Sequence, residues 1–455
     1  MKRPSVDALS APLMRLINSP RDSPPNGVAV AGARDIGGRL LMVACMGSGL
    51  DTINQGSISQ SVKSIELFSG AGGLALGLEQ AGFHTVGLFE RDPDACATLR
   101  LNRPTWCVQE GDVREVDYAL YGPVDLVAGG PPCQPFSMGG KARGFSDRRD
   151  MFPEAVRAVR ELRPGAFLFE NVRGLLRPAF SDYVEFIRLQ LTYPDFPVSS
   201  NVDWSTNLRR LQRHHTAKDA RGGLVYQVTI NLADAANYGV PQRRHRVFFV
   251  GFRADLDVGW SFPSITHTQD ELLRSQYVTG EYWGEHRKGV KALWAVPETL
   301  EKRISSLRSG DLLSLFSRWR TVRDGLRGLP EPEFGESALP FTNHRFQPGA
   351  RSYPGHTGSP LDEPSKALKA GDHGVPGGEN MLRRPDGSVR YFSVRESARI
   401  QTFPDDWRFA SSWTESMRQL GNAVPVELAR VVAASIAAKL APRAKGVVKS
   451  VSSSR

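Results

Sequence analysis

One cysteine stands in a loop where it could act as a nucleophile. Cys133 lies within residues 129–137, Gly-Gly-Pro-Pro-Cys-Gln-Pro-Phe-Ser, where two glycines and three prolines exclude a helix. The largely apolar residues 124–128 before it are typical of a buried strand in a parallel sheet. Ligands of open α/β sheets bind at the carboxyl ends of the strands, so Cys133 is expected at a binding edge. Taken alone, Cys133 fits two interpretations, a buried apolar side chain or a reactive thiol.

A glycine-rich turn is expected at the same edge. Residues 69–73, Ser-Gly-Ala-Gly-Gly, follow a predicted strand and let the backbone approach a ligand closely. Glu90 ends the next strand twenty residues after Gly70, where an acid binds ribose hydroxyls in dinucleotide-binding folds. The glycine pattern is Gly-x-Gly-Gly and not Gly-x-Gly-x-x-Gly. This difference argues against a nicotinamide oxidoreductase.

A carboxylic acid and an amide end another predicted strand. Glu170 and Asn171 close the apolar residues 167–171. A carboxyl group held at that place could donate a proton to a reacting group or share one with it. The alternative is a helix N-cap or a surface acid at the end of a strand.

Three polar side chains lead into the last predicted strand, residues 246–251. Gln242, Arg244 and Arg246 occupy alternating positions, so their side chains share one face. They could form a solvated basic strand edge. The apolar run that follows argues against this alternative, because a buried strand seldom opens with free charges.

Strands and helices must alternate to bring these residues to one edge. The apolar pattern predicts strands at 64–68, 85–90, 124–128, 167–171 and ending near 112, and helices at 74–81, 94–101 and 157–162. Gly82 is placed to end the first helix. The alternation predicts an α/β fold with a doubly wound, mostly parallel sheet. Residues 226–230 and 246–251 could pair antiparallel and complete it.

The alternation ends after residue 253. Residues 254–378 contain scattered aromatic residues, many arginines and many turn residues, and a helix is predicted at 300–319. They suggest a separate, smaller domain. Ser393 and Glu396 form a capping box that predicts the start of a helix. A last helix is predicted at 426–440.

A basic stretch precedes the antiparallel pair. Residues 199–223 contain Arg209, Arg210, Arg213, His214, His215, Lys218 and Arg221. The stretch fits either a solvated helix face or an insertion that contacts phosphates.

The composition indicates a soluble globular protein with an excess of basic residues. There are 58 Lys and Arg against 48 Asp and Glu, with a formal net charge of +10 and a pI near 9.5. This balance favours a polyanionic partner such as nucleic acid. The four cysteines show neither metal-ligand spacing nor a disulfide framework, which suits a reducing cytosol. Residues 40–46 are too few to span a membrane. We therefore expect a cytoplasmic protein without a metal or a membrane partner.

Six segments, in order, resemble the motifs of the DNA (cytosine-5) methyltransferases. They bracket residues 64–442, most of the chain, and comprise the glycine turn 68–74, the Pro-Cys loop 131–137, Glu-Asn-Val 170–172, Gln-Arg-Arg-His-Arg 242–246, and residues 395–405 and 419–425. The resemblance implies a class I, Rossmann-like fold that binds S-adenosylmethionine. It also implies that a methyl group is transferred to C5 of a cytosine in double-stranded DNA.

The resemblance assigns catalytic roles to four residues. The thiolate of Cys133 would add to C6 of cytosine and turn C5 into a nucleophile. Glu170 would donate or share a proton at N3 of the cytosine. Arg244 and Arg246 would line the pocket that holds this base. Because the target lies inside a duplex, it would be flipped out into this pocket.

Cofactor-binding residues follow from the same resemblance. Phe68 would pack on the adenine, Glu90 would hold the ribose and Asp112 the adenine amino group. The other implied contacts are Gly70, Gly72, Gly73, Leu74, Val113, Pro131, Asn422 and Ala423.

The resemblance also suggests a division of the chain. Residues 1–62 are expected to be a disordered extension or the result of a start codon placed too early. A catalytic S-adenosylmethionine-binding domain (63–253) and a target-recognition domain (254–378) follow. The chain then returns to the catalytic domain (379–442) and ends in a disordered tail (443–455).

Two other functions are compatible with parts of this pattern. A methyltransferase acting on tRNA would share the architecture, but a separate domain of roughly 120 residues favours sequence readout in duplex DNA. A catalytically inactive DNA-binding regulator would be expected to lack Cys133, Glu170 or the glycine turn. We therefore expect a monomeric bacterial enzyme, associated with the nucleoid through DNA. It would protect the site of a restriction endonuclease without forming a stable complex with it.

Overall fold

A computed structural model describes residues 61–132, 150–199, 201–217, 223–286, 296–310, 315–334, 340–370 and 380–451, with side chains up to residue 441. The N-terminal extension as far as residue 60 and the loop residue Cys133 lie outside these ranges. Among the helices in these ranges, none combines the length and the apolar character that a membrane span needs.

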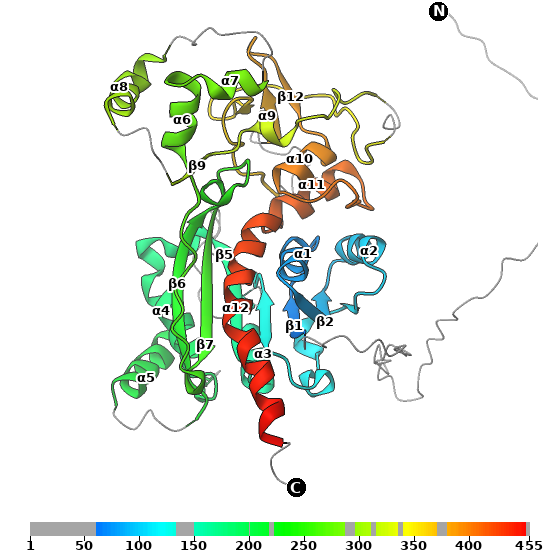
Figure 1. Cartoon of the computed structure of the whole chain (residues 1–455). Helices are drawn as coiled ribbons and strands as arrows, with labels where there is room; N and C mark the ends of the chain where they lie inside the picture. Colours follow the sequence, from blue (N-terminus) through cyan, green and yellow to red (C-terminus); the bar gives the residue numbers. More distant parts are fainter. Residues whose placement is uncertain are drawn as a thin grey trace, which may run out of the picture. The chain divides into compact units, whose positions relative to one another are not determined.

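A seven-stranded sheet forms the centre of the described chain (Figure 1). Its order is β3-β2-β1-β4-β5-β7-β6, with β1 to β5 parallel and β7 antiparallel to both β5 and β6. The bounds are β1 Val62–Leu67, β2 Phe83–Glu90, β3 Val108–Glu110, β4 Leu126–Gly129, β5 Ala166–Val172, β6 Tyr226–Asp234 and β7 His245–Arg253. The predicted doubly wound, mostly parallel sheet and its closing antiparallel pair are confirmed.

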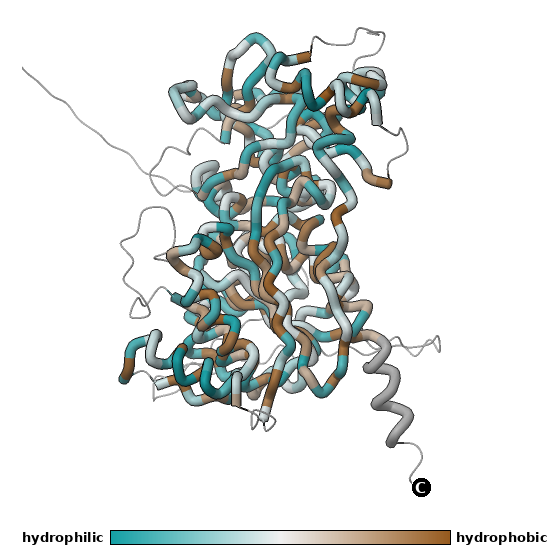
Figure 2. The backbone as a smooth tube through the Cα atoms, turned by 90° about the vertical axis from the view of Figure 1, so that its left-hand side faces the viewer, coloured by the Kyte–Doolittle hydropathy of each residue, from teal (hydrophilic) through white to brown (hydrophobic). Residues whose placement is uncertain are grey.

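Helices cover both faces of this sheet because its strands are apolar on both sides. Leu126 and Ala128 of β4 pack in one buried cluster with α12, whereas Val127 packs in another with α3 and α4. Brown, hydrophobic residues run along the central strands in Figure 2. The helices are α1 Gly73–Gln80, α2 Pro93–Asn102, α3 Phe152–Leu162, α4 Ser181–Thr192, α5 Trp204–Thr216 and α12 Val426–Val451.

The first and last of these helices approach each other unusually closely. A Cβ atom at Gly73 would overlap the carbonyl oxygen of Val424, and one at Gly77 would overlap Ala429. Both positions therefore need glycine for packing. Gly82 has a φ of 89° after α1, as expected for the residue that ends a helix.

Two predicted helix ends are wrong. The helix predicted at 300–319 is α8, Glu301–Ser309, and it stops where Gly310 takes an extended conformation. The later residues Ser317–Arg318 form β9, which pairs with β8, His267–Thr268. Pairing with a distant strand outweighs local helix preference there. At the other end, α12 continues to Val451, into the predicted tail, because extending a formed helix is cheap compared with starting one.

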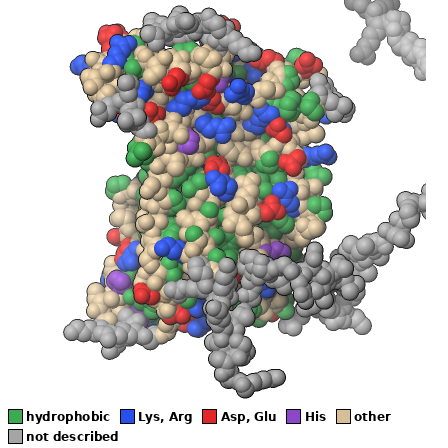
Figure 3. Space-filling model, viewed as in Figure 1, with side chains coloured by type: hydrophobic (Ala, Val, Ile, Leu, Met, Phe, Trp, Pro, Cys, Tyr) green, Lys and Arg blue, Asp and Glu red, His purple; other side chains and the backbone are tan. Residues whose placement is uncertain are grey.

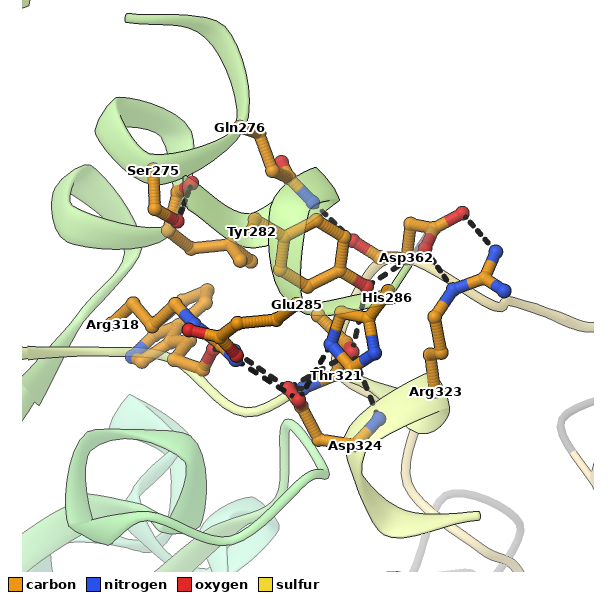
Figure 4. A network of polar contacts seen from close by, with 12 residues as sticks. Ser275, Gln276, Tyr282, Glu285, His286, Arg318, Thr321, Arg323, Asp324 and Asp362 are labelled. Atoms are coloured by element: carbon orange, nitrogen blue, oxygen red, sulfur yellow. Dashed lines mark hydrogen bonds and ion pairs between the residues drawn. The ribbon is translucent and has the colours of Figure 1, made fainter. Parts of the chain in front are cut away.

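A polar network organises the region between β7 and the return of the chain (Figure 4). The hydroxyl of Tyr282 lies 3.0 Å from Thr321 Oγ1 and donates to Asp362 Oδ1 at 2.7 Å. Asp324 accepts from Arg318 at 2.7 Å. These bonds connect three stretches of chain. The elements here are α6 Gln269–Tyr277, α7 Glu281–His286, α9 Val322–Gly325, β10 Ser359–Pro360, β11 Met381–Arg383 and β12 Val389–Tyr391.

The returning segment is held by buried charges. The predicted capping box of Ser393 and Glu396 is present at α10, Val394–Ile400. Glu396 also pairs with Arg390, and both side chains are buried. Arg395 donates to the carbonyl oxygens of Pro404 and Trp407, which fixes the approach to α11, Trp413–Asn422.

The close approach of α1 and α12 predicts a stability effect. Replacing Gly73 with alanine should lower the free energy of unfolding by about 1–3 kcal/mol, because the new methyl group meets rigid backbone. Urea unfolding of the ligand-free protein measures this change.

The matched control is Gly284→Ala in α7, where an added Cβ meets nothing within 4 Å. This variant should gain about 0.5–1 kcal/mol from helix preference. Equal stabilities of the two variants would contradict the packing argument.

Candidate active site

The glycine turn and Glu90 are joined at the carboxyl edge of the sheet. Phe68, Gly70 and Gly72 all have positive φ angles of 58°, 51° and 85°, which turn the chain sharply after β1. The N–H of Gly70 donates to Glu90 Oε2 at 2.8 Å. Glu90 Oε1 accepts from the two backbone N–H groups that follow it, each at 2.8 Å. The ends of β1 and β2 are therefore fixed by one carboxylate.

Glu66 is a second acid beneath this turn that sequence reasoning missed. Its side chain is buried in β1, and none of the described residues forms a hydrogen bond with its Oε2. Burial, together with the charge of Glu90, raises the pKa of Glu66 well above its usual range. The sequence feature that could have identified Glu66 is an acidic residue within an otherwise apolar strand.

Asp112 lies next to Glu90 at the same edge. The N–H of Gly111 donates to the carbonyl of Glu90 at 2.9 Å, which places the end of β3 beside β2. Asp112 pairs with Arg114 at 2.5 Å. The hydrogen bond from Arg114 lowers the pKa of Asp112 to about 2, so this carboxylate is charged at neutral pH. Val113 is buried behind it.

The far end of the chain returns to the glycine turn. Asn422 and Ala423 end α11 directly before Val424, whose carbonyl lies against Gly73. Asn422 is exposed and Ala423 is buried. Arg418 of α11 forms an ion pair with Asp92, the residue that caps α2. Leu74 is buried in the first turn of α1.

The root of the Cys133 loop is firmly held, although Cys133 itself lies outside the described residues. Asn171 Nδ2 donates to the carbonyl of Pro131 at 2.9 Å. The N–H of Met151 donates to the carbonyl of Pro132 at 3.1 Å. The two flanks of residues 133–149 are therefore bonded to each other and to β5.

Asp150 and Tyr183 strengthen the second flank, and sequence reasoning missed both. The hydroxyl of Tyr183 in α4 donates to Asp150 Oδ2, and Asp150 Oδ1 accepts from the N–H of Phe152 at 3.2 Å. No local pattern connects positions thirty-three residues apart.

Glu170 is buried beside the same root. A Cβ at Gly130 would lie 3.2 Å from Glu170 Oε2, so the carboxyl group borders the start of the loop. Arg246 forms an ion pair with Glu170 from the neighbouring strand β7. Burial raises the pKa of Glu170, and the charges of Arg246 and Arg244 oppose this rise. A carboxyl group in this setting keeps its proton to a higher pH than a free glutamic acid.

Arg244 is buried and bonds to two backbone carbonyls. Its Nη1 donates to Leu368 O at 2.9 Å and its Nη2 to Gly421 O at 2.5 Å. Burial lowers the pKa of Arg244 well below its usual value. Its guanidinium thus connects the residue before β7 to two distant segments, while its Nε has no hydrogen-bond partner among the described residues. Gln242 is also buried, and its amide finds no partner among the described residues.

The edge as a whole combines two chemical functions. The glycine turn, whose Gly70 N–H is bonded to Glu90, lies at the same edge as Asp112, and this combination suits a nucleoside-like ligand. A few residues away, a buried acid and a guanidinium flank the root of a loop that contains a cysteine. This arrangement suits proton transfer and covalent catalysis.

Comparisons with known proteins agree with this geometry. The family model described as C-5 cytosine-specific DNA methylase matches residues 62–203 and 180–438. The type II methyltransferase M.NgoMIV of Neisseria gonorrhoeae is 34% identical over 377 residues, covering 82% of this chain and 96% of the relative. M.Eco47II of Escherichia coli is 36% identical over 388 residues, covering 83% and 80%.

A solved structure shares the fold. It is a candidate DNA modification methyltransferase encoded within a prophage of Escherichia coli, with 22% identity and a TM-score of 0.53. The alignment covers 84% of this chain and 99% of that protein. The family match spans nearly all of the described chain, and the two relatives align along most of their length. The chain belongs to the C-5 cytosine-specific DNA methylases.

Proposed function

We propose that the protein transfers a methyl group from S-adenosylmethionine to C5 of a flipped-out cytosine in a specific double-stranded DNA sequence. The observation that carries this proposal is the buried pair of Glu170 and Arg246 beside Gly130, at the root of the Cys133 loop. Family membership supports the reaction class. The geometry supports the division of labour among the residues.

The reaction needs a nucleophile and an acid on opposite sides of the pyrimidine. The Cys133 thiolate adds to C6, forming a carbon–sulfur bond while the electron pair moves toward N3. Glu170 gives or shares a proton at N3, which leaves an enamine whose C5 can attack the methyl group of a bound S-adenosylmethionine. The bond from the methyl carbon to the sulfonium sulfur would break, and S-adenosylhomocysteine would leave with that electron pair. Loss of the C5 proton to water would then expel the thiolate, and return of the N3 proton to Glu170 would restore the aromatic ring. Arg246 orients Glu170, and Arg244 holds the surrounding segments in place.

The methyl donor fits the cradle formed by the glycine turn. When bound, S-adenosylmethionine supplies an electrophilic methyl group on a sulfonium. Glu90 would accept its ribose hydroxyls and Asp112 its adenine amino group. The other residues of the cofactor site are Phe68, Gly70, Gly72, Gly73, Leu74, Val113, Pro131, Asn422 and Ala423. A glycine turn that follows a buried strand and is bonded to Glu90 supports this assignment.

Duplex DNA must be opened and read. Flipping a cytosine out of the stack costs a few kcal/mol, which binding must offset. Residues 254–378 act as the target-recognition domain and residues 379–442 return the chain to the catalytic domain. The polar network around Tyr282 and Asp324 supports a recognition region with its own internal order.

The biological setting is restriction-modification. Both of the relatives described above bear the name of type II methyltransferases, and a chain with one catalytic core and one recognition region suits that task. The enzyme acts as a monomer at the nucleoid. It marks the site of a cognate endonuclease without a stable complex between the two proteins.

Replacing Cys133 with serine should abolish DNA methylation and leave cofactor binding unchanged, because a serine hydroxyl is a far weaker nucleophile than a thiolate. Bisulfite sequencing of host plasmid from strains expressing each protein measures the product. Methylation confined to one short motif in the wild-type strain alone is expected. Wild-type levels of methylation in the Cys133→Ser strain would refute the nucleophile, and an unmodified plasmid in both strains would favour an RNA substrate.

Replacing Glu170 with glutamine should slow methylation by about 10²- to 10⁴-fold, because the amide keeps the shape but cannot give up a proton. Burial raises the pKa of Glu170, so the wild-type rate should fall as the pH rises through that raised value. Residual activity of the variant should lack this alkaline decline. Single-turnover rates between pH 6 and pH 9 measure both effects.

Glu185→Gln is the control for Glu170, since Glu185 forms a partly exposed pair with Arg188 on α4. Its pH profile should match that of the wild type. A wild-type alkaline decline in Glu170→Gln would assign the titration to another group.

Replacing Glu90 with glutamine should weaken S-adenosylmethionine binding by about 10- to 100-fold, because a hydrogen bond to a charged group contributes about 1.5–3 kcal/mol. Isothermal titration calorimetry without DNA measures the affinity. Glu110→Gln, which alters a half-exposed acid one strand away, should bind as the wild type does. Equal affinities in all three proteins would place the cofactor elsewhere.

A further inference from the structure

Helix α5 presents arginines that have no acidic partner. Arg209, Arg210 and Arg213 bond only to hydroxyl, amide or carbonyl oxygens within their own helix. The single acid between residues 199 and 217 is Asp203, which caps the helix by accepting from the N–H of Thr206 at 2.9 Å. No carboxylate within the described residues therefore neutralises these three guanidinium groups.

This pattern differs from the other helices. Arg188 of α4 pairs with Glu185 at 2.6 Å, and Arg430 of α12 pairs with Glu427 at 2.6 Å. Acidic and basic side chains are intermixed on the face drawn in Figure 3. An ordinary solvated helix face would carry both signs in the same way. The arginine face of α5 is an exception that such a face does not explain.

Aromatic packing holds α5 in a fixed position. Trp204 meets Tyr183 of α4 edge-on, with ring centroids 5.7 Å apart. The hydroxyl of Tyr193 lies 2.7 Å from His215 Nδ1 at the other end of the helix. Arg210 lies over the ring of Phe196 at 5.6 Å. The positive charges are thus arranged on a rigid support, which reduces the entropy lost when a ligand binds.

A groove runs beside the arginines. It has a volume of about 240 Å³ and lies between α3 and the connection from α4 to α5. Arg157, Arg160, Tyr193 and Phe196 contribute to its lining. Glu154 also lines the groove and pairs with Arg157, whereas no ion pair among the described residues includes Arg160. Because Phe196 also contacts Arg210, the groove and α5 form one surface.

The part of this surface that carries Arg210 lies toward the end of the sheet opposite the candidate active site, whereas Trp204 at the start of α5 reaches Tyr183 beside the Cys133 loop. Asp195, in the connection from α4 to α5, pairs with Arg163, three residues before β5 begins. It also accepts from the N–H of Leu224, shortly before β6. Figure 1 accordingly shows α5 beside the end of the sheet away from α10 and α11. A straight duplex held at the catalytic edge would not follow this surface.

We propose that α5 and the adjoining groove form a second DNA-binding surface, which holds the phosphodiester backbone of a DNA segment other than the one being methylated. Guanidinium groups match phosphate geometry and need no base contacts for this. The net charge of +10 agrees with a polyanionic ligand. Binding a second segment would keep the enzyme on long DNA between methylation events.

The double variant Arg209→Gln and Arg213→Gln tests this proposal, because both side chains are exposed and their loss leaves the core intact. Its affinity for a duplex without a methylation site should depend less on salt. The slope of log K against log salt concentration should fall by about 2, since each lost phosphate contact removes about 0.9. Fluorescence anisotropy at several salt concentrations measures the slope.

The matched control removes an exposed and a partly buried arginine that do have acidic partners, Arg100→Gln and Arg188→Gln. It should keep the wild-type slope. Single-turnover methylation of the shortest duplex that the enzyme modifies should be unchanged in both double variants. Repeated methylation along one long DNA should fall several-fold in the α5 variant and stay unchanged in the control variant. This inference rests on the proposed function, but binding to DNA without a methylation site is measured separately from methylation. A protein that does not methylate DNA could therefore still pass or fail the test of the α5 surface.

Three results would overturn the proposal. Equal salt slopes in the wild type and the α5 variant would remove the phosphate contacts. Slower methylation of the short duplex would place α5 on the path of the methylated DNA itself. Polyglutamate serves as a probe for acidic proteins. If the α5 variant bound DNA as the wild type does but no longer bound polyglutamate, the surface would be assigned to an acidic protein partner. A charge-reversed variant, Arg213→Glu, repeats the measurement with a larger expected decrease in DNA affinity.

Discussion

The buried guanidinium of Arg244 is the constraint on which the candidate site depends. A charge without water is costly unless hydrogen bonds satisfy it, and removing a partner of a buried charge costs about 3–5 kcal/mol. Arg244 meets part of this demand with the carbonyls of Leu368 and Gly421, which follow it by 124 and 177 residues, while its Nε has no partner in the described chain. This one side chain thereby fixes three segments to one another: the strand that supports Glu170, the returning chain and the end of α11.

Two ion pairs extend the same principle around the edge. Arg246 holds Glu170 across β5 and β7, and Arg418 holds α11 against Asp92 at the start of α2. Each pair joins elements that are distant in the sequence. The two sides of the candidate site, proposed to hold the cofactor and the base, are therefore positioned by charges that only the complete fold can bring together.

Local patterns predicted the strands, the glycine turn, the antiparallel pair and the capping box, because each depends on neighbouring residues. The same reasoning could not identify the partners of Arg244 or the bond between Asp150 and Tyr183, which arise from tertiary contacts. The helix expected at 300–319 failed for a related reason, since Ser317 and Arg318 near its predicted end pair with a distant strand. The role of Cys133 stays a prediction, because this residue lies outside the described ranges.

The contact between Gly73 and Val424 has a consequence for biosynthesis. Val424 leaves the ribosome 351 positions after Gly73, a delay of roughly 20 to 70 seconds at bacterial rates of translation. Throughout that interval α1 lacks the helix that buries its inner face, and the glycine turn lacks its neighbour. Nascent chains therefore expose apolar surface until α12 has been made. The glycine turn therefore obtains its neighbour at Val424 only after nearly the whole chain has been made.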